Sequence, residues 1–476
     1  MNDLKICNLE IAETDYGNYL FDGLHFSVHS HSDNFIDLMR HLKENRVFPP
    51  AGLYSNKEYI YAMRMIKSGL WFMAEPFDIK SQHRDSSVVT LSFAPVHECN
   101  LRCRYCFAQA GKVFKGEKRN MDAKTLKSAI CMLKRSFPVC KAMRLEFVSG
   151  GEPLLNADMI KIAVNLAEEI FEQVQIYIVT NGTIYDESLL RFLRNRNVAI
   201  GVSIDGNEGV HDANRVFSSG GGTYRSVMQT VTKLFQNKIR TEYGKTVWMV
   251  SVVTTNTDSL VTVLKHAFEK GFDALEMRIA RGTLENEEFL NRNTILYFKT
   301  LYKELTDYII DCLKEGHEKP LMMITNESDS FGKFIKRLFS KTLTFYRCTA
   351  GKSKFALTST GEFYPCDSFV GMEEYRLCEI DDQKKLIQNN ILCKQSIDEI
   401  YPCKHCGYRY LCAGDCYYNA CKNTGKIDCV DEIHCDMNRY LIGLALHLVF
   451  YVEQNHELLY RRVCKMVKYR NLLNPL

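Results

Sequence analysis

Residues 97–107 read His97-Glu98-Cys99-Asn100-Leu101-Arg102-Cys103-Arg104-Tyr105-Cys106-Phe107 and place three cysteines at the spacing C-x3-C-x2-C. The apolar run Val88–Ala94 comes just before them, which predicts a strand followed by a cysteine-bearing loop. Three thiolates can hold three irons of a [4Fe–4S] cluster and leave the fourth iron to bind a substrate or a second cofactor. A zinc site completed by His97, or three buried cysteines, would use the same residues. The close, incomplete set of thiols favours the cluster.

Aromatic residues stand on both sides of the third cysteine, at Tyr105 and Phe107. With this feature the motif resembles that of the radical S-adenosylmethionine (SAM) enzymes. In that family the amino and carboxylate groups of SAM bind the open iron, and an electron from the cluster cleaves SAM to a 5′-deoxyadenosyl radical that takes a hydrogen atom from the substrate. The resemblance implies that SAM is the cofactor and that Cys99, Cys103 and Cys106 hold its cluster.

Bulk composition excludes several classes of protein. The chain has 476 residues, 46% of them hydrophobic, and a net charge of +4 without a dense basic block, so we expect a large core and no nucleic-acid partner. No secretory signal opens the sequence, and the apolar run Leu441–Val452 is too short to cross a membrane, so we expect a cytoplasmic protein. In a reducing compartment its 19 cysteines indicate metal binding or catalysis rather than disulfides.

Residues 1–82 are predicted to form a small separate unit of three short strands followed by helices, the latter at Phe35–Lys43 and Asn56–Ser68. This order resembles the winged-helix peptide-recognition domains of enzymes that modify ribosomally made peptides. The resemblance implies that an edge strand binds the leader of a precursor peptide by strand addition. The alternative is a packing extension without a binding role.

Residues 83–320 alternate between strand and helix patterns, which predicts an α/β fold with a parallel sheet, a partial (β/α)6 barrel. The active sites of such barrels lie at the carboxyl ends of the strands. The six predicted strands are Val88–Ala94, Arg144–Val148, Gln175–Val179, Val198–Ile204, Val247–Thr254 and Ala274–Ile279.

Several motifs follow these strands directly. By resemblance, the Gly-Gly-Glu turn after the second strand binds the SAM amino group, Arg215 meets the SAM carboxylate, and Ser203 is preferred over Asp205 as a SAM contact. A helix-capping turn at Asn181 and a surface role for Arg215 are the alternatives. The residues assigned to SAM are Tyr105, Phe107, Gly150, Gly151, Glu152, Asn181, Ser203 and Arg215. No catalytic base is assigned.

A second set of regularly spaced cysteines lies in the last third of the chain. Cys348 is followed by twelve residues, Gly361, four residues and Cys366. The run Cys403-x2-Cys406-x5-Cys412-x3-Cys416 comes next, and Cys435 ends the pattern. All these spacings resemble the seven-cysteine SPASM extension of radical SAM proteins, which carries two auxiliary iron–sulfur clusters. A zinc ribbon is the alternative for the C-x2-C pair.

The SPASM resemblance divides the seven ligands between two clusters. It assigns Cys403, Cys406, Cys412 and Cys435 to the distal cluster, and Cys348, Cys366 and Cys416 to the proximal one. The proximal cluster then lacks one thiolate, which Cys378, Cys393 or a substrate cysteine would supply. The expected order of domains is a leader-binding unit at 1–82, the barrel at 83–320, a helical linker at 321–347, the SPASM domain at 348–436 and a C-terminal helix at 437–476.

The whole arrangement most resembles peptide maturases that install thioether crosslinks in ribosomally made peptides. It implies SAM and three [4Fe–4S] clusters as cofactors. It implies a precursor peptide and a reductant such as flavodoxin or ferredoxin as partners. An anaerobic sulfatase-maturing enzyme that makes formylglycine, or a maturase that forms a carbon–carbon crosslink or epimerises a residue, is an alternative built from the same parts.

Overall fold

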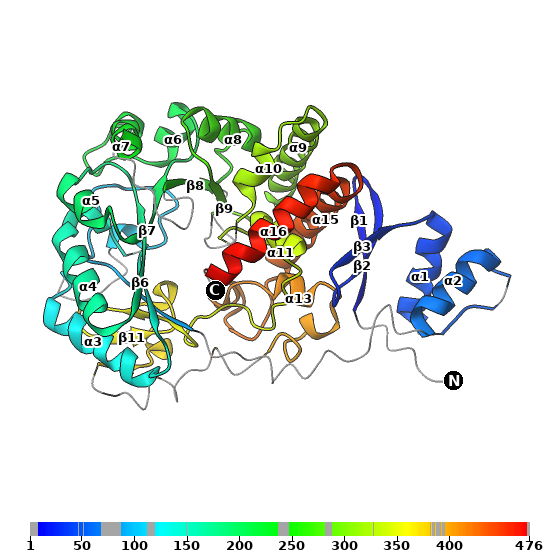
Figure 1. The fold of residues 1–476 in the computed structure, drawn as a ribbon, viewed down its shortest axis with the longest axis horizontal. Helices are drawn as coiled ribbons and strands as arrows, with labels where there is room; N and C mark the ends of the chain where they lie inside the picture. The colour runs from blue at the N-terminus through cyan, green and yellow to red at the C-terminus, as the bar shows by residue number, and fades with distance from the viewer. Residues whose placement is uncertain are drawn as a thin grey trace.

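In the part of the chain that the structure describes, the computed structural model has two sheets, one of three strands and one of nine, with helices packed around both (Figure 1). The small sheet belongs to the N-terminal segment, and the large sheet also takes in strands from the C-terminal cysteine segment. The structure describes residues 8–45, 47–50, 52–67, 87–111, 120–148, 150–236, 247–280, 288–326, 328–380, 382, 386, 392 and 396–473.

Six parallel strands form the body of the large sheet, and each pairs with the next in chain order. The six strands predicted from the sequence are confirmed, with ends shifted by at most two residues. They are β4 (Val88–Phe93), β5 (Ala142–Phe147), β6 (Gln173–Thr180), β7 (Asn197–Ser203), β8 (Val247–Val253) and β9 (Leu275–Ile279).

Helices connect these strands and cover one face of the sheet, which is called the outer face below. Alternate strand residues such as Leu91, Leu145 and Ile178 are fully or almost fully buried in the main core on that face. The intervening residues, such as Glu146 and Tyr177, point to the opposite inner face. The connecting helices are α3 (Ala123–Ser136), α4 (Ala157–Ile170), α5 (Glu187–Leu193), α6 (Glu208–Asn214), α7 (Tyr224–Gln236) and α8 (Leu260–Glu269).

The C-terminal cysteine segment extends the same sheet, a feature that the sequence analysis did not predict. Strand β10 (Lys354–Leu357) pairs in parallel with β4, and β11 (Glu362–Tyr364) and β12 (Cys378–Glu379) follow in antiparallel order. The turn between β10 and β11 contains Gly361, whose φ of +92° requires glycine. Strands β10 and β11 therefore form a hairpin that continues the parallel sheet.

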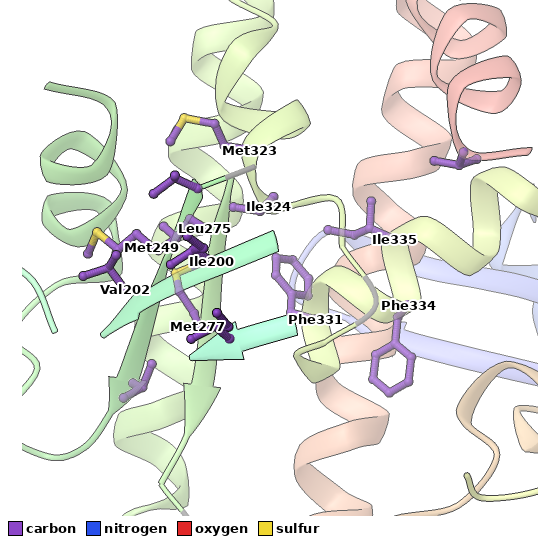
Figure 2. Packing of buried hydrophobic residues seen from close by; sticks show 14 of the residues in the cluster. Ile200, Val202, Met249, Leu275, Met277, Met323, Ile324, Phe331, Phe334 and Ile335 are labelled. Atoms are coloured by element: carbon purple, nitrogen blue, oxygen red, sulfur yellow. The ribbon is translucent and has the colours of Figure 1, made fainter. Parts of the chain in front are cut away.

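Long helices pack against the far end of the sheet. Asp329 caps α11 (Ser330–Ser340) and accepts the N–H of Met277 on β9 at 3.1 Å. Figure 2 shows Phe331 of α11 beside Met277 in this part of the core. The remaining helices after β9 are α9 (Ile295–Lys314), α10 (Lys319–Ile324), α13 (Arg409–Cys412), α14 (Tyr417–Thr424), α15 (Glu432–Asn455) and α16 (Glu457–Leu473). Of these, α14 packs with residues of β10 and β11.

Helix α15 crosses the boundary that the sequence predicts after residue 436, because it begins at Glu432 and already includes Cys435. It also contacts strands β1 and β3 of the small sheet, so it joins the N-terminal and C-terminal segments. In the part of the chain that the structure describes, no helix is long and apolar enough to cross a membrane.

The N-terminal unit consists of the antiparallel sheet β1 (Leu9–Thr14), β2 (Gly17–Asp22) and β3 (Ser27–Ser30), followed by α1 (Asp33–Asn45) and α2 (Asn56–Lys67). Leu9, Leu20 and Phe35 form part of a small core between the sheet and α1. The other face of the sheet lies against α15. The predicted strands-then-helices order is present, while the predicted boundary at residue 82 lies outside the described residues.

The environment of His447 on α15 predicts that the stability of the folded protein depends on pH. Its Nδ1 lies 2.6 Å from the Tyr19 hydroxyl, and its ring stacks on Tyr16 at 3.9 Å. Burial lowers the pKa of His447 to about 4. Because the unfolded value is about 6.5, the unfolded chain binds a proton first on acidification, and stability falls as the pH drops from about 6.5 to about 4.

We expect the variant His447→Gln, which cannot titrate but can still accept the Tyr19 hydroxyl, to reduce this pH dependence. One such histidine contributes a slope of up to about 1.4 kcal/mol per pH unit. Thermal unfolding under anaerobic conditions at pH 7 and pH 5 measures the effect. A variant that loses as much stability as the wild type between these pH values would contradict the assignment.

Candidate functional site

The first cysteine loop leaves the carboxyl end of β4 and is anchored to the end of α6, where the N–H of Arg104 donates to the carbonyl of Asn214 at 3.0 Å. The thiols of Cys99, Cys103 and Cys106 are all partly buried. Burial raises the pKa of Cys103 to about 11, and negative charge on the other two thiols adds to the shift. The three predicted cluster ligands therefore lie close enough together to interact electrostatically.

Arg215, Asp205 and Tyr105 form a buried charged network beside this loop. Oδ2 of Asp205 accepts Nε of Arg215 at 3.1 Å and the hydroxyl of Tyr105 at 2.7 Å. Its other oxygen accepts the N–H of Val252 at 3.0 Å. Nη1 of Arg215 lies 3.9 Å from Sγ of Cys103. Burial opposes the charge of Arg215, but Asp205 holds the pKa of Arg215 above its ordinary value.

Asp205 has a larger structural role than the sequence analysis gave it. It is fully buried and gathers three donors, whereas Ser203, the preferred residue of the pair, is the last residue of β7 and 7% exposed. Arg215 is also buried rather than on the surface. The sequence carries Asp205 next to Ser203, but it does not show that Tyr105, about a hundred residues earlier, donates to the same carboxylate.

His211 and Thr223 support this network, although no sequence motif points to either residue. Nδ1 of His211 accepts the N–H of Asp205 at 3.4 Å, and Nε2 lies 2.9 Å from the Thr223 hydroxyl. Thr223 in turn donates to the carbonyl of Arg215 at 3.0 Å. Burial lowers the pKa of His211 to about 3, so the ring is neutral and its Nε2 proton points to Thr223.

The Gly-Gly-Glu turn after β5 packs directly on the cysteine loop. The N–H of Glu152 donates to the carbonyl of Glu98 at 2.8 Å. A side chain at Gly151 would come within 2.3 Å of the Val96 carbonyl oxygen, so only glycine fits. Gly150 has a φ of +88°, which also favours glycine. The two glycines therefore permit backbone contact between the turn and the loop.

The carboxylate of Glu152 is engaged within the protein. It accepts the Thr180 hydroxyl at 2.6 Å and the N–H groups of Asn181 at 2.7 Å and Leu154 at 3.1 Å. Burial raises the pKa of Glu152, while these three donors oppose the rise. Its carboxylate thus connects the turn to the end of β6, and the backbone of the turn faces the cysteine loop.

Asn181 connects the end of β6 to the same loop. Its Nδ2 donates to Oδ1 of Asn100 at 2.8 Å and lies 3.7 Å from Sγ of Cys99. Phe107, which follows the third cysteine, is 43% exposed. The residues that the resemblance assigned to SAM therefore come from the loop after β4, from the carboxyl ends of β5, β6 and β7, and, for Arg215, from the end of α6. Phe107 is the most exposed of them.

Cys348, Cys366 and Cys416 form a second group, called the proximal group. Burial raises the pKa of Cys366, and negative charge on the other two thiols adds to this rise. The Lys354 ammonium opposes it. Nζ of Lys354 lies 2.6 Å from Oε2 of Glu146 on the inner face of β5. The proximal group is therefore connected to the inner face of the parallel sheet.

The two candidate fourth ligands of the proximal group are placed differently. Cys378 pairs with Phe363, and both belong to the main core. Cys366 and Tyr364 belong to a separate cluster on the other side of β11. Because paired residues in neighbouring strands point to the same face, Cys378 points away from Cys366. Cys393 lies outside the described residues.

Cys403, Cys406, Cys412 and Cys435 form a third group, called the distal group. Burial raises the pKa of Cys403 to about 12, and charge on the other three members adds to the shift. Burial likewise raises the pKa of Cys406 to about 11. The charges of these four thiols therefore act on one another, and their assignment to a distal cluster stays a prediction.

The donor chemistry of all three groups fits iron–sulfur clusters. Thiolates are soft ligands that suit such clusters, and each thiolate of a cluster binds a different iron. Among the described residues, no three or more His, Cys, Asp or Glu side chains are arranged to hold a metal ion. Burial lowers the pKa of His97, the alternative zinc ligand, to about 4.

Comparison with known proteins relates the chain to one superfamily. Residues 94–267 match the family model of the radical SAM superfamily. The cysteine-type anaerobic sulfatase-maturating enzyme of Clostridium perfringens is 28% identical over 339 residues, which cover 67% of this chain and 85% of that protein.

Solved structures share the fold. The structure of anSMEcpe with bound AdoMet superposes with a TM-score of 0.60 at 21% identity, covering 79% of this chain and all of that one. Streptococcus suis SuiB bound to precursor peptide SuiA gives a TM-score of 0.50 at 14% identity and covers 90% of this chain and 98% of that one.

Proposed function

Since residues 94–267 form a radical SAM domain, we propose that this enzyme is a peptide maturase that installs a thioether crosslink, from a cysteine sulfur to a carbon, in a ribosomally made precursor peptide. The observation that carries the proposal is the interaction of seven C-terminal cysteines in two groups, with the proximal group connected through Lys354 to the inner face of the sheet. Thioether formation removes two electrons from the peptide. Redox sites beside the substrate could accept an electron from this oxidation.

The SAM-binding cluster is assigned to Cys99, Cys103 and Cys106, and the residues proposed around SAM are Tyr105, Phe107, Gly150, Gly151, Glu152, Asn181, Ser203 and Arg215. When bound, this cluster and SAM supply reductive cleavage of SAM and removal of a hydrogen atom from the substrate. The protein itself orients the loop. Arg215 places a cation 3.9 Å from Cys103, and Asn181 directs an amide N–H toward Cys99 at 3.7 Å.

The proximal and distal groups would hold one [4Fe–4S] cluster each, which gives about twelve iron atoms per chain with the first cluster. Their chemistry would be to accept the second electron of the oxidation. The proximal group contributes Cys348, Cys366 and Cys416, so one coordination position is left for Cys393 or for a cysteine of the peptide. A substrate thiol bound there would be held as the thiolate, the nucleophilic form of cysteine.

The N-terminal unit is proposed to bind the leader of the precursor peptide. Its outer strand β3 pairs only with β2 in the sheet that the structure describes. A free strand edge can accept an extended peptide by main-chain hydrogen bonds. A small reductant such as flavodoxin or ferredoxin would supply electrons from outside.

Formylglycine formation is the second candidate, and one observation favours it. The matched region covers 85% of the cysteine-type sulfatase-maturating enzyme of C. perfringens.

A second observation favours the precursor-peptide maturase instead. The superposition with anSMEcpe leaves about a fifth of this chain without a counterpart. An additional peptide-binding unit would account for such an excess in a precursor-peptide maturase. Carbon–carbon crosslinking and epimerisation use the same parts and are separated by the same experiment.

The test is to incubate the reduced, anaerobic enzyme and SAM with two peptides and to examine each by mass spectrometry. The first peptide is a short cysteine-rich precursor, with its leader, encoded beside the gene of the enzyme. The second is a sulfatase-derived peptide with its target cysteine. We expect the precursor to lose two hydrogens, to keep all its sulfur and to lose one site of thiol alkylation.

The other outcomes identify the alternatives. Loss of cysteine sulfur with gain of a hydrazide-reactive aldehyde would establish formylglycine formation. Loss of two hydrogens with every thiol still alkylated would establish a carbon–carbon crosslink. Unchanged mass in water with uptake of one deuterium in heavy water would establish epimerisation. Each of these three results would overturn the thioether proposal.

A further inference from the structure

The loop that carries Cys406 is built against the N-terminal sheet. The N–H of Gly407 donates to Oε2 of Glu10 on β1 at 3.0 Å. A side chain at Gly407 would come within 2.8 Å of the Leu9 carbonyl oxygen, so this approach requires glycine. Glu10 is 5% exposed, and its carboxylate also forms an ion pair with Lys43 of α1. The carboxylate of Glu10 is therefore fixed beside the distal group.

Arg439 lies between this carboxylate and the distal cysteines. It follows Cys435 by one turn of α15, and its charge opposes the rise that burial causes in the pKa of the Cys435 thiol. Nη2 lies 3.4 Å from Sγ of Cys406, and Nη1 lies 3.8 Å from Oε1 of Glu10. The guanidinium also stands over the Tyr408 ring at 5.6 Å. One cation thus contacts the Cys406 thiol of the distal group and one buried carboxylate.

Other charges also act on the same group. Burial raises the pKa of Cys412 overall, while Lys333 lowers it, and Arg347 acts on Cys403 in the same sense as Lys333. Asp415 and Asp436 raise the pKa of Cys435. Arg439 differs from Lys333 and Arg347 in that a hydrogen bond from it to a sulfur of the distal group is established.

We propose that Arg439 is a positioning residue that raises the reduction potential of the distal cluster, and that Glu10 limits this effect. The inference rests on the proposed function, in which Cys403, Cys406, Cys412 and Cys435 hold that cluster. Positive charge and hydrogen bonds at cluster sulfurs stabilise the reduced, more negative state. Because Glu10 belongs to β1, the N-terminal sheet contributes directly to the redox property of the distal cluster.

The two residues are expected to act with opposite signs. Arg439→Gln removes the cation and should lower the reduction potential, so that the ratio of reduced to oxidised distal cluster at a fixed potential falls about tenfold, or ~59 mV for a one-electron couple. Arg439→Lys should keep part of the effect. Glu10→Gln can still accept the Gly407 N–H but loses its charge, so it should raise the potential. General loosening of the region would not give shifts of opposite sign.

The experiment is an anaerobic potentiometric titration of the full chain, followed by electron paramagnetic resonance. It is carried out in the Cys99/Cys103/Cys106→Ala background, so that the proximal and distal signals are not overlapped by the first cluster. The proximal signal serves as an internal reference. Arg461→Gln is the matched control, because Arg461 on α16 is an exposed arginine whose ion-pair partner is Glu457.

The outcomes separate this inference from the proposed function. About eight irons per chain in this background, with opposite shifts of the distal potential and an unmoved proximal potential, would support it. About four irons per chain and a single signal would overturn the proposed function. The distal cysteines are retained in this background, and this result would mean that they hold no cluster. Two clusters with an unmoved distal potential, or with shifts of the same sign in both variants, would overturn the role of Arg439 and Glu10. If Arg439→Gln fails to fold, Arg439→Lys and Glu10→Gln decide.

Discussion

The combined variant Cys99/Cys103/Cys106→Ala is expected to form no 5′-deoxyadenosine from SAM and to lose about four of about twelve iron atoms per chain. The three thiols share one loop, and their charges act on one another in the structure. Alanine at all three positions removes every protein ligand proposed for the SAM-binding cluster. Anaerobic assay of 5′-deoxyadenosine after reduction and quantification of iron measure the two effects.

Cys131→Ala is the matched control, because Cys131 is a partly buried thiol of α3 outside the three cysteine groups. It should leave both the iron content and 5′-deoxyadenosine formation at the wild-type level. If the triple variant still cleaved SAM at the wild-type rate, the assignment of the catalytic cluster would be wrong.

Asp205→Ala is expected to cause the largest loss of stability among single substitutions at the site. It leaves the buried charge of Arg215 without its carboxylate and removes the acceptor of Tyr105 and of the Val252 N–H. Breaking a buried ion pair by removing one partner costs about 3–5 kcal/mol. SAM affinity should fall as well, because Arg215 would no longer be fixed beside Cys103.

Thermal unfolding and calorimetric titration with SAM measure these two effects. Asp311→Ala is the control, since Asp311 pairs with Lys314 on the surface of α9 and such exposed pairs contribute at most about 1 kcal/mol. Asp205→Asn should lie between Asp205→Ala and the wild type, because an amide oxygen can still accept hydrogen bonds. Equal stability of the two alanine variants would contradict the central position of Asp205.

Local sequence patterns predicted much of the fold. The apolar runs of β4 to β9 are short and flanked by helical stretches, so their type and order follow from periodicity. The same patterns could not predict that β10 pairs with β4, because the pairing joins Lys354 to Thr90 across more than 260 residues. The start of α15 was also missed, because its apolar spacing begins at Met437 although Asp431 already caps the helix.

The three cysteine groups are predicted from regular spacing in the sequence. Asp205 was named beside Ser203, but the sequence does not show that Tyr105, about a hundred residues earlier, donates to its carboxylate. His211 and Thr223 support Asp205 and Arg215 through side-chain hydrogen bonds, and neither stands in a spacing pattern. Glu10 and Arg439 are farther apart still, on β1 and α15. Glycine gives a partial signal, since Gly151 and Gly407 occupy positions where a side chain would collide with another segment.

We propose that this enzyme removes a hydrogen atom from a peptide and joins the resulting carbon to a cysteine sulfur. The most direct measurement uses a precursor peptide deuterated at its carbon positions, with mass analysis of both 5′-deoxyadenosine and peptide. We expect 5′-deoxyadenosine to contain one deuterium. The peptide should have lost one deuterium and one alkylatable thiol while keeping its sulfur. Unlabelled 5′-deoxyadenosine together with an unchanged peptide would contradict it.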